Sequence, residues 1–454
     1  MTGFSGTTQG TGGEAPHDLR GGETAAARGG DGRSGTATDH LMEEVVEWSN
    51  VEKALARVRQ NKGSPGVDGM TVDELPKHLE GAWEAIRGQL LAGTYQPKPV
   101  LRREIPKGDG GTRKLGIPCV LDRLIQQAIL QRLQPIFDPT FSEHSHGFRP
   151  GRGAHKAVRE AQGYVQEGYR WVVDVDLEKF FDRVNHDVLM GRLAKRIADK
   201  RLLGLIRRYL NAGIMVHGVV VECNEGTPQG GPLSPLLANV LLDEVDKELE
   251  RRGHKFVRYA DDSNVYVRTQ RAGLRVLEGL KRLYAKLKLR VNEEKSAVGR
   301  PHERSFLGFS FWYGPGGVAR RRVSRKALGV MKGKVRRLTR RSGGKSMKMV
   351  AEGLGKYLSG WGEYFKLAET PGVMRSLDEW IRHRLRAIQL KHWKRGTTAF
   401  REVRKLGFSV DLAAKVAFGT RRWWWNASKA LHIALPTSTF DKMGVPQLSR
   451  YYTS

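Results

Sequence analysis

The sequence predicts an α+β fold in which a region of mixed helices and strands precedes an all-helical region. Between Tyr95 and about Phe311, short runs of strand-forming residues alternate with helical apolar patterns. After about residue 312 the strand signals stop, and helical patterns rich in Lys and Arg follow. The first 40 residues have almost no large apolar side chains to offset their ordering entropy, so we expect them to be disordered. We therefore expect four parts of the chain: a disordered segment over 1–40, a domain of mixed helices and strands over 41–311, a helical domain over 312–410, and a short basic tail over 411–454.

Apolar periodicity locates the individual elements along the chain. Apolar residues three or four positions apart predict helices near 45–58, 72–79, 83–91, 122–133, 187–210, 232–249 and 274–287. A Gly-Asp-Gly-Gly turn predicts a β-hairpin over Arg102–Pro118. The apolar run Trp171–Leu177 predicts a further strand.

Composition limits the possible partners. The formal net charge is +30, and an excess this large favours a polyanionic partner, although a generally solvated basic surface would carry the same charge. No apolar run approaches the roughly 18 residues that a membrane helix needs, so we expect no membrane partner. Cys119 and Cys223 lack Cys or His neighbours at zinc spacing and are expected to be buried structural thiols.

One hairpin carries the most informative residues. Apolar and aromatic residues of Phe256–Val267 flank a Tyr-Ala-Asp-Asp turn, Tyr259–Asp262, which predicts two carboxylates at a hairpin tip. Asp176 ends the Trp171–Leu177 strand, and adjacent strands would bring three carboxylates together. Two unit charges about 4 Å apart repel by about 4 kcal/mol at an effective dielectric constant of about 20. Such a cluster favours bound cations, and two divalent ions held by aspartates are typical of nucleotidyl transfer. Taken alone, however, each Asp motif is also compatible with an ordinary strand end or turn.

Other segments support this chemistry when they are taken together. The run GTPQGGPLSP, residues 226–235, predicts an unusual loop that either is a rigid connector or holds Gln229 against a nucleotide. Lys107 and Arg113 flank the tip of the Gly-rich hairpin, where they could contact a triphosphate or simply be solvated.

An ordered set of motifs makes the family recognisable. In chain order these are IPKGDGGTRKLGIP, DRLIQQAIL, HGFRPGRGAHKA, DVDLEKFFD, GTPQGGPLSPLLANVLLDEVD, RYADD, LRVNEEKS and FLGF. The set resembles the successive blocks of reverse transcriptases encoded by bacterial group II introns, over residues 45–410. The resemblance implies a right-hand polymerase, with fingers and palm over 41–311 and a helical thumb, the maturase or X domain, over 312–410.

The resemblance also implies roles for particular residues. Asp176, Asp261 and Asp262 match the catalytic aspartates, which with the backbone carbonyl of Leu177 would hold two Mg²⁺ ions. The residues expected at the deoxynucleotide are Lys107, Arg113, Phe181 (as a gate against the ribose 2′-hydroxyl), Gln229 and Lys295. Phe306, Leu307 and Gly308, at the start of FLGF, match the turn that supports the primer end. Phe181 has a simpler alternative as a core aromatic.

The activity implied is RNA-directed DNA synthesis with assistance to splicing and mobility of a group II intron. The expected partners are the intron RNA, an RNA template, a DNA primer or target, and deoxynucleotides, in a bacterial cytoplasm; an oligomer is possible. The region after residue 410 has one His and no Cys, so we expect the Cys/His endonuclease of many relatives to be absent. Two alternatives stay open: the same polymerase in a domesticated role such as defence or repair, and an RNA-binding splicing cofactor with a vestigial polymerase site.

Overall fold

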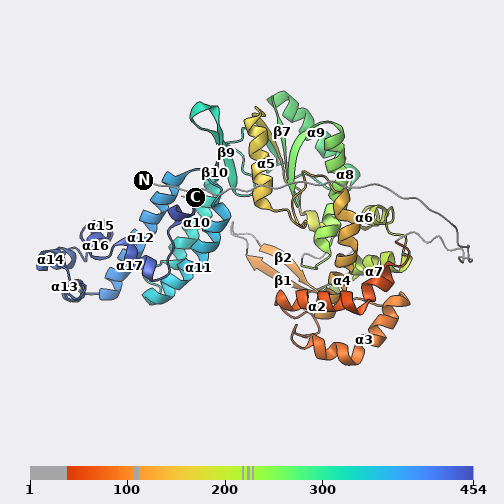
Figure 1. The fold of residues 1–454 in the computed structure, drawn as a ribbon, viewed down its shortest axis with the longest axis horizontal. Helices are drawn as coiled ribbons and strands as arrows, with labels where there is room; N and C mark the ends of the chain where they lie inside the picture. The colour runs from red at the N-terminus through yellow and green to blue at the C-terminus, as the bar shows by residue number, and fades with distance from the viewer. Residues whose placement is uncertain (1–37, 107–111, 217–218, 222–224, 228–229, 453–454) are drawn as a thin grey trace, which may run out of the picture. The chain divides into compact units, whose positions relative to one another are not determined.

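The computed structural model describes residues 38–106, 112–216, 219–221, 225–227 and 230–452 (Figure 1). From Thr38 onward the chain forms one compact unit. The helices of its first part are α1 (Leu41–Val46), α2 (Trp48–Gln60), α3 (Leu75–Leu91), α4 (Val120–Phe137), α5 (Ala154–Gln166), α6 (His186–Leu193), α7 (Lys200–Asn211), α8 (Ser234–Arg251) and α9 (Gln270–Lys286). The later helices are α10 (Arg325–Leu338), α11 (Met347–Phe365), α12 (Pro371–Trp393), α13 (Gly396–Lys405), α14 (Val410–Phe418), α15 (Trp423–Ser428), α16 (Ala430–Ala434) and α17 (Thr437–Lys442).

The strands form three sheets within the described residues. The N-terminal sheet has the order β2-β1-β4-β5 and the central sheet the order β6-β7-β3-β8, while β9 and β10 form a separate hairpin. The strands are β1 (Val100–Pro106), β2 (Thr112–Ile117), β3 (Trp171–Val175), β4 (Ile214–Val216), β5 (Val219–Val221), β6 (Lys255–Tyr259), β7 (Asp262–Val267), β8 (Ala297–Gly299), β9 (Phe309–Tyr313) and β10 (Ala319–Val323).

Helices cover both faces of the central sheet, and this arrangement explains its strand sequences. Val172 of β3 and Tyr266 of β7 belong to a hydrophobic cluster with α5 and the later helices. Val173 and Val265 belong to a second cluster with α8 and α9, which lie beside this sheet in Figure 1. Both faces of the sheet are therefore covered by apolar side chains.

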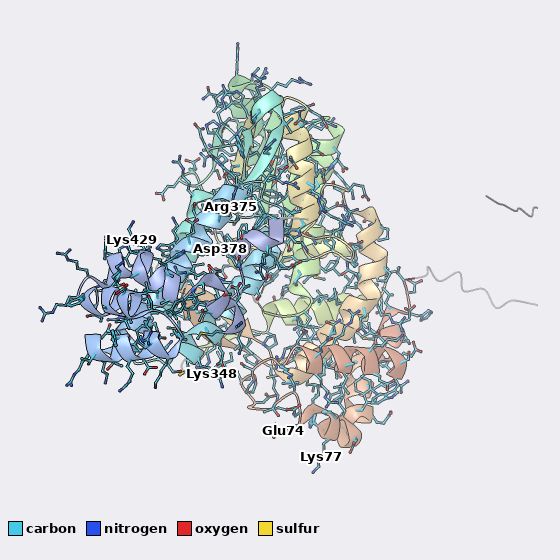
Figure 2. All side chains as sticks on the ribbon, turned by 60° about the vertical axis from the view of Figure 1, so that its left-hand side comes forward. Glu74, Lys77, Lys348, Arg375, Asp378 and Lys429 are labelled. Carbon is cyan, nitrogen blue, oxygen red and sulfur yellow. The ribbon has the colours of Figure 1, made fainter. Side chains whose placement is uncertain are left out.

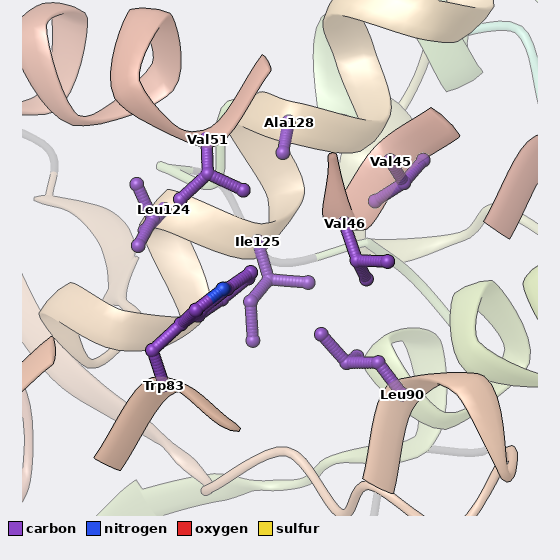
Figure 3. Close-up of a pocket in the computed structure, with 8 residues that line it drawn as sticks. All are labelled: Val45, Val46, Val51, Trp83, Leu90, Leu124, Ile125 and Ala128. Carbon is purple, nitrogen blue, oxygen red and sulfur yellow. The ribbon is translucent and has the colours of Figure 1, made fainter. Parts of the chain in front are cut away.

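The N-terminal sheet and the helices around it contain the predicted Arg102–Pro118 hairpin. Strands β1 and β2 pair antiparallel from Leu101–Ile117 to Pro106–Thr112, which confirms that prediction. Apolar side chains of α1 to α4 pack against one another, with Val46, Val51, Trp83 and Ile125 among the residues drawn in Figure 3.

Some predicted helices differ in extent from the observed ones. The two patterns at 72–79 and 83–91 form one helix, α3, and the single pattern at 187–210 forms two, α6 and α7. Asp199 explains the second case, because its carboxylate caps α7 by accepting the backbone N–H groups of Arg201 and Leu202. Residues 1–37 of the segment expected to be disordered lie outside the described residues. Thr38 is ordered, since its carbonyl accepts the N–H of Asp199 at 3.1 Å.

The prediction that strands end near residue 312 is wrong. Residues 319–323, Ala-Arg-Arg-Arg-Val, form β10, which pairs antiparallel with β9 from Ala319–Tyr313 to Val323–Phe309. Three consecutive arginines hide the strand pattern, and pairing with the aromatic strand β9 decides the local structure. The boundary at 312 therefore cuts a hairpin, and the all-helical part begins with α10.

The segment after residue 410, expected to be a short basic tail, is folded. Residues 410–452 fold into short helices that pack on α12. Arg382 of α12 donates to Asp441 at 2.9 Å, and Asp378, labelled in Figure 2, accepts the N–H groups of Leu448 and Ser449 at 2.7 and 2.8 Å.

Within the described residues, none of the helices is long and apolar enough to cross a membrane.

Candidate active site

The Tyr-Ala-Asp-Asp segment forms the predicted hairpin turn. Strand β6 ends at Tyr259 and β7 begins at Asp262, which pair with each other across a two-residue turn. Ala260, the first turn residue, has φ +57°, a left-handed conformation that costs roughly 1–2 kcal/mol for a residue with a Cβ. The surrounding structure must therefore hold this turn in place.

The structure brings Asp176 next to this turn. Strand β3 pairs antiparallel with β7 from Trp171–Val267 to Val175–Ser263, so the next register position places Asp176 opposite Asp262. Because side chains alternate along a strand, both lie on the same face of the central sheet as Asp174. Strand pairing therefore brings Asp176 to Asp262, and Asp261 precedes Asp262 in the turn.

The electrostatics agree with crowded carboxylates. Burial, followed by the charges of Asp174, Asp261 and Asp176, raises the pKa of Asp262 to about 8, partly offset by the backbone N–H of Leu307. Burial also raises the pKa of Asp174 to about 6, although Arg304, 3.8 Å away, opposes this. A cation would remove much of the cost of ionising these groups.

The donor set suits a divalent cation, because carboxylate oxygens are the ligands that Mg²⁺ prefers. Within the described ranges, no three His, Cys, Asp or Glu side chains are already arranged as a metal-binding group. The suitability of this site for a divalent cation therefore rests on its carboxylate donors and on the raised pKa of Asp262.

A buried ion pair, which the sequence analysis did not identify, supports the hairpin turn. Arg258, 1% exposed, contacts Asp246 of α8 through three N–O distances of 2.6–2.9 Å. Arg258 also donates to the side chain of Asn239 and to the carbonyl of Ala260, each at 2.9 Å. We call Arg258, Asp246 and Asn239 the Arg258 cluster. An arginine directly before Tyr-Ala-Asp-Asp in an apolar strand was the available sequence signal.

The HGFRP motif lies against the back of this turn. The N–H of His146 donates to the Arg258 carbonyl at 2.9 Å, and Asn239 donates to the Gly147 carbonyl at 2.9 Å. A Cβ on Gly147 would come within 2.2 Å of the Ala260 nitrogen, so only glycine allows this approach.

The LRVNEEKS motif holds the strand end that carries Asp176. Ser296 accepts the N–H of Asp176 at 2.9 Å, and the N–H of Asn292 donates to the Asp176 carbonyl at 2.8 Å. Leu177 is buried and bridges to Val291. Lys295 is exposed on the same turn, and its role at the nucleotide stays a prediction.

Phe181 lies where the DVDLEKFFD and GTPQGGPLSP motifs meet. Its side chain is 9% exposed and packs edge-on against Phe180, with the ring centroids 5.0 Å apart. Its carbonyl accepts the N–H of Thr227 at 2.7 Å, and Gly226 has φ +94° beside it. These contacts fit the core alternative, so the gate role stays a prediction.

The remaining nucleotide residues are only partly described. Lys107 and Gln229 lie outside the described residues. Arg113 pairs with Ile105 in the β1–β2 ladder, but its side chain lies outside what is described. Gly230, next to Gln229, is close to β2, because a Cβ there would come within 2.5 Å of the Gly116 carbonyl.

The FLGF motif forms a tight turn beside Asp262. Phe306 and Phe309 exchange backbone hydrogen bonds of 2.9 Å, and the turn residues Leu307 and Gly308 have φ +51° and +80°. The backbone N–H of Leu307 faces the Asp262 carboxylate. The predicted primer-support turn and catalytic hairpin are therefore neighbours.

Carboxylates close together at the end of paired antiparallel strands, on a strongly basic chain, are typical of a nucleic acid polymerase. Comparison with known proteins agrees. Residues 105–311 match the family model "Reverse transcriptase (RNA-dependent DNA polymerase)", and residues 328–407 match "Group II intron, maturase-specific domain". The chain belongs to the family of group II intron-encoded reverse transcriptases with a maturase domain. It thus carries an RNA-directed DNA polymerase domain.

Individual relatives have similar sequences. "Protein YkfC" of Escherichia coli (strain K12) is 33% identical over 304 residues, which are 58% of this chain and 79% of that protein. "Group II intron-encoded protein LtrA" of Lactococcus lactis subsp. cremoris is 35% identical over 246 residues, 54% of this chain but only 40% of LtrA. Among solved structures, a "Partial Cas6-RT-Cas1--Cas2 complex" is 28% identical, covers 54% of this chain and 42% of that chain, and has a TM-score of 0.36. A TM-score this low adds nothing to the fold assignment.

Proposed function

We propose that the protein copies RNA into DNA at Asp176, Asp261 and Asp262 and assists the splicing and mobility of a group II intron RNA. The observation that carries the proposal is the register of β3 against β7, which brings Asp176 opposite the Asp261–Asp262 turn. The raised pKa of Asp262 supports it, because a site with neighbouring carboxylates favours a bound cation.

The family uses divalent metal ions, and we propose Mg²⁺ held by the three carboxylates and the Leu177 carbonyl. When bound, Mg²⁺ supplies the positive charge that activates a primer 3′-hydroxyl and stabilises the leaving pyrophosphate. The aspartates act as ligands in this proposal, and none of them needs to be a general base.

Other residues would position the reactants. Lys295, Lys107 and Arg113 would contact the triphosphate, and Gln229 would contact the incoming nucleotide. The Phe306–Leu307–Gly308 turn would support the primer end. The maturase-specific domain and the net charge of +30 favour binding of intron RNA through phosphate contacts. We propose a cytoplasmic location in a bacterium, with the nucleic acid it binds.

The decisive experiment replaces Asp261 and Asp262 together by Asn. Neutral side chains of the same shape relieve carboxylate repulsion, so the variant should stay folded and bind RNA normally. DNA synthesis on an RNA template should be lost, as it should be when the wild type is treated with a chelator, and added Mg²⁺ should restore only the wild type. Asp174→Asn, on the same sheet face, is the matched control and should keep most activity. Near-normal synthesis by the double variant would contradict the assignment.

The gate role of Phe181 needs its own test. Phe181→Ala should increase ribonucleotide incorporation relative to deoxynucleotide incorporation if the ring excludes the 2′-hydroxyl. If Phe181 is only a core aromatic, the variant should lose stability without any change in this ratio.

The alternative of a splicing cofactor without polymerase activity makes a different prediction. Wild-type protein would then promote splicing at low Mg²⁺ but extend no primer. The presence of all three aspartates, with Asp176 at the end of β3 opposite the Asp261–Asp262 turn, favours an active polymerase instead.

A further inference from the structure

The turn at Leu307–Gly308 is strained and needs support from its surroundings. Leu307 has φ +51°, a conformation that costs roughly 1–2 kcal/mol for a residue with a Cβ. Residues in such conformations persist only where neighbouring contacts hold them.

Residues outside the maturase-specific domain provide some of these contacts. Besides the reciprocal Phe306–Phe309 bonds, the Gly308 carbonyl accepts the N–H of Ser324 at 2.8 Å. The N–H of Leu307 faces the Asp262 carboxylate. One backbone unit therefore connects the strained turn to the catalytic hairpin.

Helix α11 of the maturase-specific domain provides the other contacts. The hydroxyl of Tyr364 donates to the Leu307 carbonyl at 2.9 Å. The ring of Phe365 backs the turn so closely that a Cβ on Gly308 would come within 3.0 Å of it. The N–H and the carbonyl of Leu307 thus face different domains: one faces Asp262 and the other bonds to Tyr364.

Tyr364 is itself fixed to the polymerase part. Its carbonyl contacts Nε2 of His155 in α5 at 2.6 Å, and its ring lies 6.0 Å from that of Phe309. The Tyr364 side chain is half-buried, and its hydroxyl donates to the Leu307 carbonyl.

We infer that Tyr364 is a positioning residue for DNA synthesis, through which the maturase-specific domain holds the Leu307–Gly308 turn beside Asp262. The inference rests on the proposed role of this turn in supporting the primer end. A residue of the domain associated with splicing thereby sets the alignment of the reacting primer terminus, and the two domains share one polymerase site.

The test compares Tyr364→Phe with Tyr357→Phe. Both changes remove one hydroxyl from α11, but the Tyr357 hydroxyl makes no hydrogen bond to any of the described residues. Single-nucleotide addition on a primed RNA template is measured at saturating template, together with the KM for deoxynucleotide, the melting temperature and the affinity for RNA.

Tyr364→Phe should lower kcat by about 5- to 10-fold, because the Leu307 carbonyl loses its side-chain donor and the primer end loses alignment. The KM for deoxynucleotide should change by less than about twofold, and melting temperature and RNA affinity should match those of Tyr357→Phe. A second variant, Leu307→Gly, relieves the strain, so adding Tyr364→Phe to it should lower kcat less than in the wild type.

Two results would overturn the inference. One is equal kcat for the two Tyr→Phe variants, and the other is a parallel fall of kcat, stability and RNA affinity that indicates a general structural role. If wild-type protein extends no primer, the proposed function itself fails, which distinguishes that outcome from failure of the inference alone.

Discussion

Removal of Asp246 tests whether the Arg258 cluster holds the Tyr259–Asp262 turn, which carries two of the proposed catalytic aspartates. Asp246 is fully buried and Arg258 is 1% exposed, so neither group has water to replace its partner. Asp246→Ala would leave the guanidinium buried and unpaired. Breaking a buried pair in this way costs about 3–5 kcal/mol.

This free energy is large compared with the roughly 5–15 kcal/mol that stabilises a typical protein. At about 2 °C per kcal/mol for a region of this size, the melting temperature should fall by roughly 6–10 °C. Since Arg258 also donates to the Ala260 carbonyl, loss of its orientation should loosen the turn that carries Asp261. DNA synthesis should therefore fall even at temperatures where the variant is fully folded.

The matched control is Glu248→Ala on the same helix, α8. Glu248 pairs with Arg251 and Arg252 at the surface, where solvent replaces lost contacts, so the melting temperature should change little. Thermal unfolding of both variants, followed by primer extension well below the lower midpoint, separates stability from activity. Equal melting temperatures for the two variants would refute the reasoning, and normal synthesis by Asp246→Ala would show that the turn does not depend on Arg258.

Three further predictions follow from particular contacts. Gly147→Ala should impair folding or DNA synthesis, because the new Cβ would lie 2.2 Å from the Ala260 nitrogen. The control Gly153→Ala should be tolerated, because a Cβ there would have no atom within 4 Å. Thermal unfolding and primer extension compare the two variants. The stabilising effect of Glu160, measured as the melting-temperature difference from Glu160→Gln, should be greatest between about pH 4.5 and 6.5. Burial raises the pKa of Glu160, but hydrogen bonds from His144, His146 and Tyr164 outweigh burial and lower this pKa to about 2. The ionised Glu160 therefore stabilises the fold fully above pH 4.5, its pKa in the unfolded chain, and this stabilisation is lost as the pH falls toward 2. Hydrogen bonding to Glu160 raises the pKa of His144 above 6.5. The stabilisation from protonated His144 is therefore fully present below pH 6.5 and is lost as the pH rises through the raised pKa. A melting-temperature difference between wild type and Glu160→Gln that does not change with pH would contradict this role of the Glu160–His144 pair. Finally, RNA affinity should fall about 10³- to 10⁵-fold between roughly 50 and 200 mM salt if about 6–10 phosphates are contacted. An affinity that does not change with salt in a binding titration would show that the basic side chains lie outside the RNA-binding surface.

Elements with strong local signals were predicted well from the sequence. The Tyr259–Asp262 hairpin has strand-forming residues on both sides of a turn, and α8 and α9 have long apolar periodicity. Helix breaks were predicted less well, because a cap such as Asp199 acts through a few backbone bonds and barely changes the apolar pattern. Strand β10 was missed because its pairing with β9, and not its own residues, determines its conformation.

The sequence by itself determined the family, the acidic motifs and the basic character of this protein, because these depend on residue identity and order. Only the tertiary structure decided that Asp176 lies opposite Asp262, that Arg258 is paired inside the molecule, and that Tyr364 contacts the Leu307 turn. Such contacts join residues far apart in the chain, and strand register and helix packing establish them through interactions that no local pattern records.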